Sequence, residues 1–408
     1  MKMNHPNIEI DQTSGLVWVS LILAFFLAAY PLLKRFFHGR QALPYPPGPP
    51  APSFVLGHFG KLPMKKPWLV YAAMEKQYGD VIYFRSLGQH IIILNSLEAT
   101  IDLLEKQARI SSDRPYTTAV DKYVGWGGNI GFLAHDDTWR NGRRVFHQSF
   151  RADAVARYQS IQSAKVHQFL RALAEPANGS QNLLEHISTL SESVVVSIVY
   201  GLDIISNKEE LPQAAKEAVD AVDLMLLPGY DTWKTIPFVH LLTKFGMIRS
   251  QRNCRVLINS IREGPFHAAL EAWKAGNTRF SVVGEMISKY NVKGGLKDGI
   301  EHIKNVGWTA TAAAADTTVS AIATFLLVIS FNPHVQVKAQ QELHQVLGHG
   351  RVPQFSDRLS LPYIEAIYRE VMRWHPALPF GVPHKTTEDI IYKGYYLPKG
   401  SLLFANLW

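Results

Sequence analysis

Apolar positions recur at helical spacing over most of the chain after Asp137. This periodicity predicts a mainly α-helical body. The predicted helices lie near residues 67–78, 97–108, 137–149, 152–174, 182–200, 209–226, 247–262, 266–274, 280–290, 303–331, 335–347 and 362–375. Short runs rich in β-branched and aromatic residues predict strands at 81–86, 90–95, 389–392, 395–397 and from 401 onward. The expected fold class is therefore mainly α with small β-sheets.

The longest predicted helix runs from Ile303 to Phe331 and ends at Asn332-Pro333. Its second half is apolar on nearly all sides, which predicts a buried helix. Its middle contains only Ala and Thr, followed by Asp316 and Thr317. Small side chains would let a flat, bulky group lie against the helix, with the Asp-Thr pair at its edge. The alternative is an Ala-rich core helix whose Asp pairs with an Arg elsewhere.

An apolar run from Leu16 to Leu33 precedes the globular part. As a helix it would span roughly 27 Å, close to the thickness of a bilayer core. Basic residues follow the run, so we expect the rest of the chain to face the cytosol. A cleaved signal peptide is the alternative, although the leading segment is not basic.

The Pro-rich segment after the apolar run is expected to be extended and semi-rigid. The resulting domain plan is a tail at 1–15, an anchor at 16–33, a basic and proline-rich hinge at 34–52 and one domain at 53–408.

The composition of the chain limits which partners we expect. The chain has 408 residues, a net charge of +8 and a single cysteine, Cys254, which excludes an internal disulfide. A basic balance favours an acidic partner or a membrane surface. No zinc-finger, basic-zipper or ribonucleoprotein motif is present, so we expect no nucleic acid partner.

Three groups of residues are candidates for ligand binding or a structural role in a site. Trp139 and Arg143 share one helix face, where an indole donor and a guanidinium suit a carboxylate or phosphate. The alternative is an ordinary basic helix with an anchoring Trp. Glu370 and Arg373 share a face of another helix. His384 follows a Pro- and Gly-rich bend, and a lone His is usually structural.

In this order and spacing, these features resemble the cytochrome P-450 family of haem-thiolate monooxygenases, in its membrane-anchored eukaryotic, fungal-like form. The resemblance covers the whole chain. Its motifs are the WxxxR helix at Trp139–Arg143, the oxygen-binding motif at Ala313–Thr318, the ExxR motif at Glu370–Arg373 and the position of Pro383-His384.

The resemblance implies the cytochrome P-450 fold and bound haem b. It places Trp139, Arg143 and His384 at the haem propionates and Ala313 beside the haem. It assigns oxygen binding to Thr317 and proton delivery to Asp316. It also implies that Glu370 and Arg373 form a buried structural pair.

The implied reaction inserts one oxygen atom from O2 into a small hydrophobic substrate of secondary metabolism. Electrons would come from NADPH through NADPH–cytochrome reductase, docked in part on Arg140 and Arg144. The implied location is the endoplasmic reticulum membrane, with a single pass and a cytosolic catalytic domain. The substrate pocket would take in the 116–130 loop, Leu224–Leu227, Ala312–Ala313 and Phe380–Val382.

Two departures from the family pattern affect these expectations. Ala314 stands where the oxygen-binding motif usually has Gly. The family's cysteine loop is absent up to Trp408, and Cys254 lies in a polar helix without that loop. The metal-ligating set is therefore expected to contain no axial cysteine.

The absent cysteine loop leaves two alternatives open. The first is a non-catalytic, membrane-tethered fragment that cannot ligate haem iron and at most binds hydrophobic ligands. The second is a metal site at His344 and His349, or at His375 and His384, although neither pair has zinc-site spacing.

We predict that protease added to sealed microsomes digests residues 53–408, because the basic residues after the anchor keep this part on the cytosolic side. Immunoblotting of the digest measures the outcome. Complete protection of the domain, with digestion only after detergent is added, would show the opposite orientation.

Overall fold

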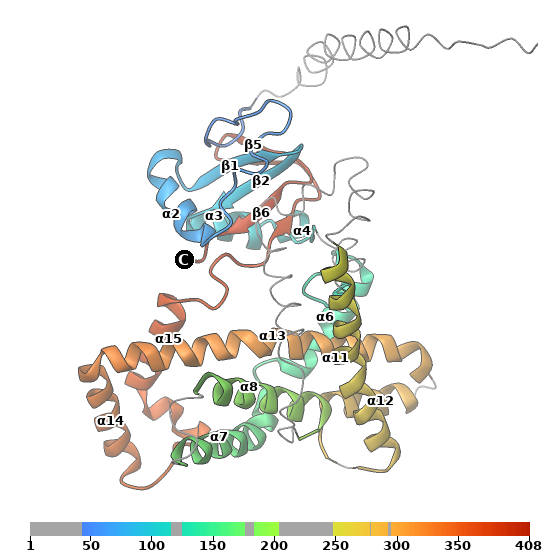
Figure 1. The fold of residues 1–408 in the computed structure, drawn as a ribbon, viewed down its shortest axis with the longest axis vertical. Coiled ribbons are helices and arrows are strands. Elements are labelled where there is room, and N and C mark those ends of the chain that lie inside the picture. Colours follow the sequence, from blue (N-terminus) through green and yellow to red (C-terminus); the bar gives the residue numbers. More distant parts are fainter. Residues whose placement is uncertain (1–42, 116–124, 176–182, 204–247, 278, 293–294) are drawn as a thin grey trace, which may run out of the picture. The chain divides into compact units, whose positions relative to one another are not determined.

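The computed structural model describes residues 43–115, 125–175, 183–203, 248–277, 279–292 and 295–408 (Figure 1). The predicted anchor at 16–33 and the predicted helix at 209–226 lie outside these residues, as do residues 34–42 of the hinge. The fold class is confirmed, because the described chain is mainly helical with small sheets.

The helices lie close to the predicted ranges. They are α2 (Pro67–Tyr78), α3 (Leu97–Thr100), the π-helix η1 (Ile101–Glu105), α4 (Ala108–Ser111), α6 (Asp137–Phe150), the 3-10 helix η2 (Val155–Tyr158), α7 (Gln159–Ala174), α8 (Leu183–Tyr200), α11 (Ile248–Lys274), α12 (Val282–Val292), α13 (Leu296–Phe331), α14 (Pro333–Leu347), the 3-10 helix η6 (Phe355–Ser360) and α15 (Pro362–Trp374). The strands are β1 (Val81–Ser86), β2 (Gln89–Leu94), β3 (His384–Lys385), β4 (Ile390–Tyr392), β5 (Tyr395–Leu397) and β6 (Leu402–Ala405).

The chain divides into two compact units. In the described part of the smaller unit, β4 and β5 form an antiparallel hairpin. The amide of Tyr396 donates to the Pro44 carbonyl at 2.8 Å, and the rings of Tyr45 and Tyr396 lie 6.1 Å apart. The hinge residues next to the hairpin are thus fixed by backbone pairing as well as by their prolines.

The larger unit holds a four-stranded sheet in the order β1-β2-β6-β3. β1 and β2 are antiparallel neighbours, whereas β2 and β6 pair in parallel, with Ile91 opposite Leu402. β2 is a central strand, and Ile91 to Leu94 are all fully buried. One face of the sheet packs with Tyr71 of α2, which stacks on Phe380 at 5.4 Å.

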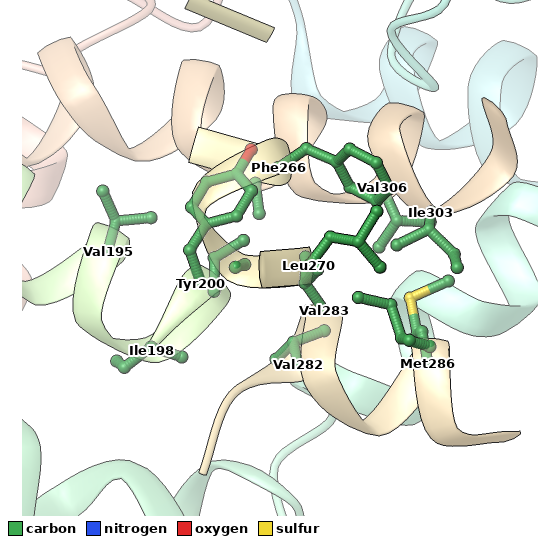
Figure 2. Packing of buried hydrophobic residues seen from close by; sticks show 14 of the residues in the cluster. Val195, Ile198, Tyr200, Phe266, Leu270, Val282, Val283, Met286, Ile303 and Val306 are labelled. Atoms are coloured by element: carbon green, nitrogen blue, oxygen red, sulfur yellow. The ribbon is translucent and has the colours of Figure 1, made fainter. Parts of the chain in front are cut away.

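The helical core of the larger unit forms around the first half of α13. Ile303 and Val306 are fully buried and pack with residues of α8, α11 and α12 (Figure 2). Gly307 allows a close approach, since a Cβ there would stand 2.9 Å from the Tyr200 hydroxyl oxygen. Burial of that phenol raises the pKa of Tyr200 to about 12. Each fully buried apolar side chain contributes roughly 1.5–3 kcal/mol.

The second half of α13 is not buried, so that prediction was wrong. Phe325 is 38% exposed, Leu327 54% and Phe331 76%. Among the described residues, α8, α14 and α15 contact this helix and leave its other sides facing outward. An apolar run can therefore be recognised as helical from its sequence, but its burial depends on which elements pack around it.

Two of the described helices are long and apolar enough to cross a bilayer, α8 and the Gly299–Phe331 part of α13. This is weak evidence for a membrane span, because core helices of soluble proteins meet the same criterion.

Two predicted helix boundaries were also wrong. α11 continues through Pro265, where the sequence predicted two helices at 247–262 and 266–274. Proline removes one helical hydrogen bond, and the burial of Phe266 and Leu270 in the core offsets that loss. The predicted helix at 97–108 is divided into α3, η1 and α4.

We predict that Leu87→Asn raises the free energy of unfolding by roughly 0.5–1 kcal/mol. Leu87 and Gly88 form the two-residue turn between β1 and β2, with φ of 47° and 81°. Leucine is strained at positive φ, whereas Asn-Gly suits such a turn. Chemical denaturation measures the change. The control is Leu97→Asn on an exposed helical leucine, and equal changes in both variants would contradict the turn-strain argument.

Candidate functional site

Helix α6 begins with a side-chain cap. The Asp136 carboxylate accepts a hydrogen bond from the Trp139 amide at 2.9 Å, which fixes the first turn. Trp139 and Arg143 follow one turn apart on one face, as predicted. Arg143 is exposed and has no ion-pair partner among the described residues. Its guanidinium is therefore available to an anion.

Asp113 connects the start of α6 to β3. The ring of His135 packs edge-on against Trp139 at 4.6 Å, and the His135 amide donates to the Asp113 carboxylate at 3.1 Å. The amide of Lys385 donates to the backbone carbonyl of Asp113 at 2.8 Å. Two segments far apart in sequence are thus held together through one residue.

His384 lies in the same neighbourhood. Its Nδ1 is 3.1 Å from the Ser111 carbonyl oxygen, which can only accept, so Nδ1 carries the proton. Arg114 donates to the carbonyls of Val382 and Pro383 at 2.8 and 2.7 Å. Burial, and secondly the nearby Arg114 charge, lower the pKa of His384 to about 4. We call Asp113, Arg114, His135, Trp139 and His384 the α6–β3 cluster.

The α6–β3 cluster and Arg143 together suit a carboxylate ligand. At neutral pH the Nε2 atom of His384 is an acceptor, but a neighbouring anion would favour the charged imidazolium, in which Nε2 donates. A cavity of about 520 Å³ also follows the basic side of α6, past Trp139, Arg140, Arg143, Arg144, His147, Gln148 and Arg151. The donors and charges therefore fit a group that carries anionic substituents.

A second group of predicted residues lies in the middle of α13. The Thr317 hydroxyl donates to the Ala313 carbonyl at 2.7 Å, which leaves its oxygen lone pairs facing outward. Ala313, Asp316 and Thr317 are all exposed. This face is open to a bulky ligand, as the small side chains predicted.

Helix α8 contributes two residues that the sequence did not single out. The Ser191 hydroxyl donates to the carbonyl of Ala314 at 3.0 Å, at the position where the family pattern has Gly. Partial desolvation, and secondly the charge of Asp316, raise the pKa of Glu192. Neither residue belongs to a motif, so only the packing of α8 on α13 reveals them.

Glu370 and Arg373 form the predicted pair on α15. Two hydrogen bonds join them at 2.7 and 2.6 Å. Their side chains are 60% and 69% exposed, so the expected burial was wrong. Within the described chain, the face of α15 that carries them points outward, because α13 and α14 contact other parts of the helix.

Only some of the residues predicted to line the substrate pocket lie in the described part of the chain. Phe380 was expected to line a substrate pocket, but it is buried in the sheet core and stacks on Phe404 at 5.2 Å. Most of the 116–130 loop and all of Leu224–Leu227 lie outside the described residues. Arg114 was missed, and its only signal was its place at the start of that Gly-rich loop.

Among the described residues, the alternative histidine sites have no third metal-ligating side chain nearby. The rings of His344 and His349 are 4.8 Å apart, whereas His375 packs on Trp408. In the residues that the structure covers, no three His, Cys, Asp or Glu side chains gather as a metal site.

Comparison with known proteins identifies the relatives of this chain. The family described as "Cytochrome P450" matches residues 46–408. Cytochrome P450 monooxygenase COX1 of Coprinopsis cinerea is 34% identical over 97% of this chain and 77% of its own length. Cytochrome P450 monooxygenase ple1 of Rhodocybe pseudopiperita is 34% identical over 96% of this chain and 73% of its own length.

Among solved structures, a zebrafish cytochrome P450 with abiraterone matches with a TM-score of 0.65 and 20% identity. The match covers 84% of this chain and 77% of that chain, and it supports the fold alone.

We predict that His384 makes the ligand-free protein less stable as the pH falls from 6.5 to about 4, because only the unfolded state takes up the proton in this window. His384→Asn should reduce the loss by roughly 3 kcal/mol. Denaturation at several pH values measures it. His167→Asn, on an exposed residue of α7, is the control. The cluster argument fails if the two variants keep the same pH dependence.

Proposed function

The chain belongs to the cytochrome P450 family of monooxygenases, and we propose that it inserts one oxygen atom from O2 into a small hydrophobic substrate, with electrons from an NADPH-dependent reductase. Relatives that are 34% identical over nearly the whole chain carry the name monooxygenase, which supports the reaction class. The substrate class follows from the family's apolar pockets and from the small Ala and Thr side chains in α13.

Haem b would be the cofactor, and the residues of this chain fit its propionates, whereas the cysteine loop that ligates the iron in the family is absent up to Trp408. Trp139, Arg143 and His384 would bind the two propionates, and Arg114 adds a positive charge beside His384. Arg143 can form two parallel hydrogen bonds to one carboxylate. Bound haem supplies the redox chemistry that activates dioxygen.

Thr317 and Asp316 would handle protons on the open face of α13. In its present position the Thr317 hydroxyl donates to Ala313, and its oxygen can accept a hydrogen bond. To pass a proton onward, the hydroxyl would turn away from the Ala313 carbonyl and give its own proton to the ligand while its oxygen accepts a proton from another donor. The exposed Asp316 carboxylate can exchange protons with solvent and act as the general acid. Ser191 would hold the Ala314 carbonyl in place and so fix the turn that carries both residues.

Glu370 and Arg373 would act as a structural pair on α15. Because both side chains are exposed, solvent screens their ion pair, which by itself contributes little to the stability of the fold. Its value would lie in fixing the direction of the two side chains.

The location would be the endoplasmic reticulum membrane, reached by one anchor at 16–33, with the catalytic domain facing the cytosol. Arg140 and Arg144 would contribute to a cationic face for the reductase. Arg140 is bound to Asp137 at 2.7 Å, so Arg144 offers the less compensated charge.

The observation that carries the proposal is the Thr317 hydroxyl bonded to the Ala313 carbonyl on an open helix face, with Asp316 next to it. An ordinary core helix would bury these side chains. Both Asp316 and Thr317 are instead accessible from outside the described chain.

We predict that Thr317→Ala lowers the product formed per NADPH about tenfold, because the proton-passing hydroxyl is lost and reduced oxygen leaves as hydrogen peroxide. The measurement is NADPH consumed, product and peroxide in a haem-loaded form that also carries the cysteine loop absent up to Trp408, together with the reductase.

Thr317→Ser should restore most of the coupling, since it keeps the hydroxyl. Thr318→Ala, the same change one residue along an exposed face, is the matched control. Unchanged coupling in Thr317→Ala would remove the hydroxyl from the proton path.

A further inference from the structure

A second cavity lies between α6, α12 and the first turns of α13, with a volume of about 760 Å³. This volume falls within the range of small-molecule sites. Its lining residues include Val145, Arg144, Arg157, Met286, Lys289 and His302. No role proposed above uses this cavity as a binding site.

The floor and the end wall of the cavity are apolar or uncharged. Val282 and Met286 are buried residues of α12 that also belong to the helical core (Figure 2). The end wall is the ring of Tyr290, which lies so close to α13 that a Cβ at Gly299 would be 2.3 Å from it. Burial lowers the pKa of His302, so that neighbouring ring stays uncharged at neutral pH.

The rim of the cavity is cationic. Among the described residues, Glu285 is the one acid that lines it, and this carboxylate is bound to Arg157 at 2.9 Å. Arg157 is also held over the Phe280 ring at 4.8 Å. Arg144 and Lys289 have no ion-pair partner in the part of the chain that the structure describes. Two positive charges therefore remain uncompensated beside an apolar floor.

The cavity shares Arg144 and Gln148 with the first cavity along α6, but Trp139 and Arg143 do not line it. Val145 is two residues after Arg143, which places it about 200° around the helix. Ser149, one turn after Val145, is buried and lines the same cavity. Trp139 and Arg143 thus belong to the candidate haem site alone, Val145 and Ser149 to this cavity alone, and Arg144 lies at the boundary between the two.

We propose that the cavity binds an amphipathic carboxylate, with its head at Arg144 and Lys289 and its apolar body over Val145 and Met286. The two cations match one anionic head, and the buried floor matches an alkyl or alicyclic body. The cavity lies between three helices, so it favours a small molecule over a flat protein surface. This site goes beyond the proposed oxygenation and does not depend on it.

Equilibrium dialysis of octanoate against the full chain, held in a neutral maltoside detergent, tests the site. We expect saturable binding that weakens about tenfold in the Arg144→Ala/Lys289→Ala double variant, because the head group loses its charge partners. The control is Arg171→Ala/Lys76→Ala, which removes the same two charges from exposed positions on α7 and α2. It should change the affinity less than about twofold.

Acetate and octan-1-ol separate the two halves of the ligand. Both should bind at least about tenfold more weakly than octanoate, since each lacks one of the two interactions. Equal affinity of octanoate for the double variant and the unmodified chain would overturn the proposal. So would equal affinity of octan-1-ol and octanoate, or the absence of saturable octanoate binding.

Discussion

The packing of the first half of α13 against α8, α11 and α12 is the constraint on which the helical part of the larger unit depends. Ile303 and Val306 lie in the same buried cluster as residues from all three neighbouring helices. Gly307 lets the phenol of Tyr200 reach the helix backbone. Because this half is fixed by burial, the same helix can present Asp316 and Thr317 on an open face without losing its position.

Hydrogen bonds between segments far apart in sequence add to the packing of the core. Asp113 joins the start of α6 to β3 through its carboxylate and its backbone carbonyl. The Ser191 hydroxyl joins α8 to α13 through its hydrogen bond to the Ala314 carbonyl. Each contact is worth only about 1 kcal/mol, so these bonds direct side chains more than they stabilise the fold.

Local geometry explains which parts of the site could be predicted from the sequence. Trp139 and Arg143, or Glu370 and Arg373, share a helix face because their spacing alone puts them there. The exposure of Glu370 and the burial of Phe380 depend on neighbouring elements, and the sequence contains no direct signal for either. Helix α11 continues through Pro265, where the sequence predicted a break between two helices. Packing against the core outweighed the tendency of proline to end a helix.

The parallel pairing of β2 with β6 has a consequence for biosynthesis. Ile91 and Leu402 are neighbours in the sheet but are separated by roughly 300 residues of chain. At about 5–20 residues per second, a ribosome needs roughly 15–60 s to make the intervening segment. During that time the edge of β2 in the nascent β1–β2 hairpin is unpaired, and isoleucines that are buried in the folded protein are exposed. Such an edge is prone to aggregation, and chaperones shield surfaces of this kind. The sheet therefore closes only after residues 402–405 have been made, when most of the described helices have already left the ribosome.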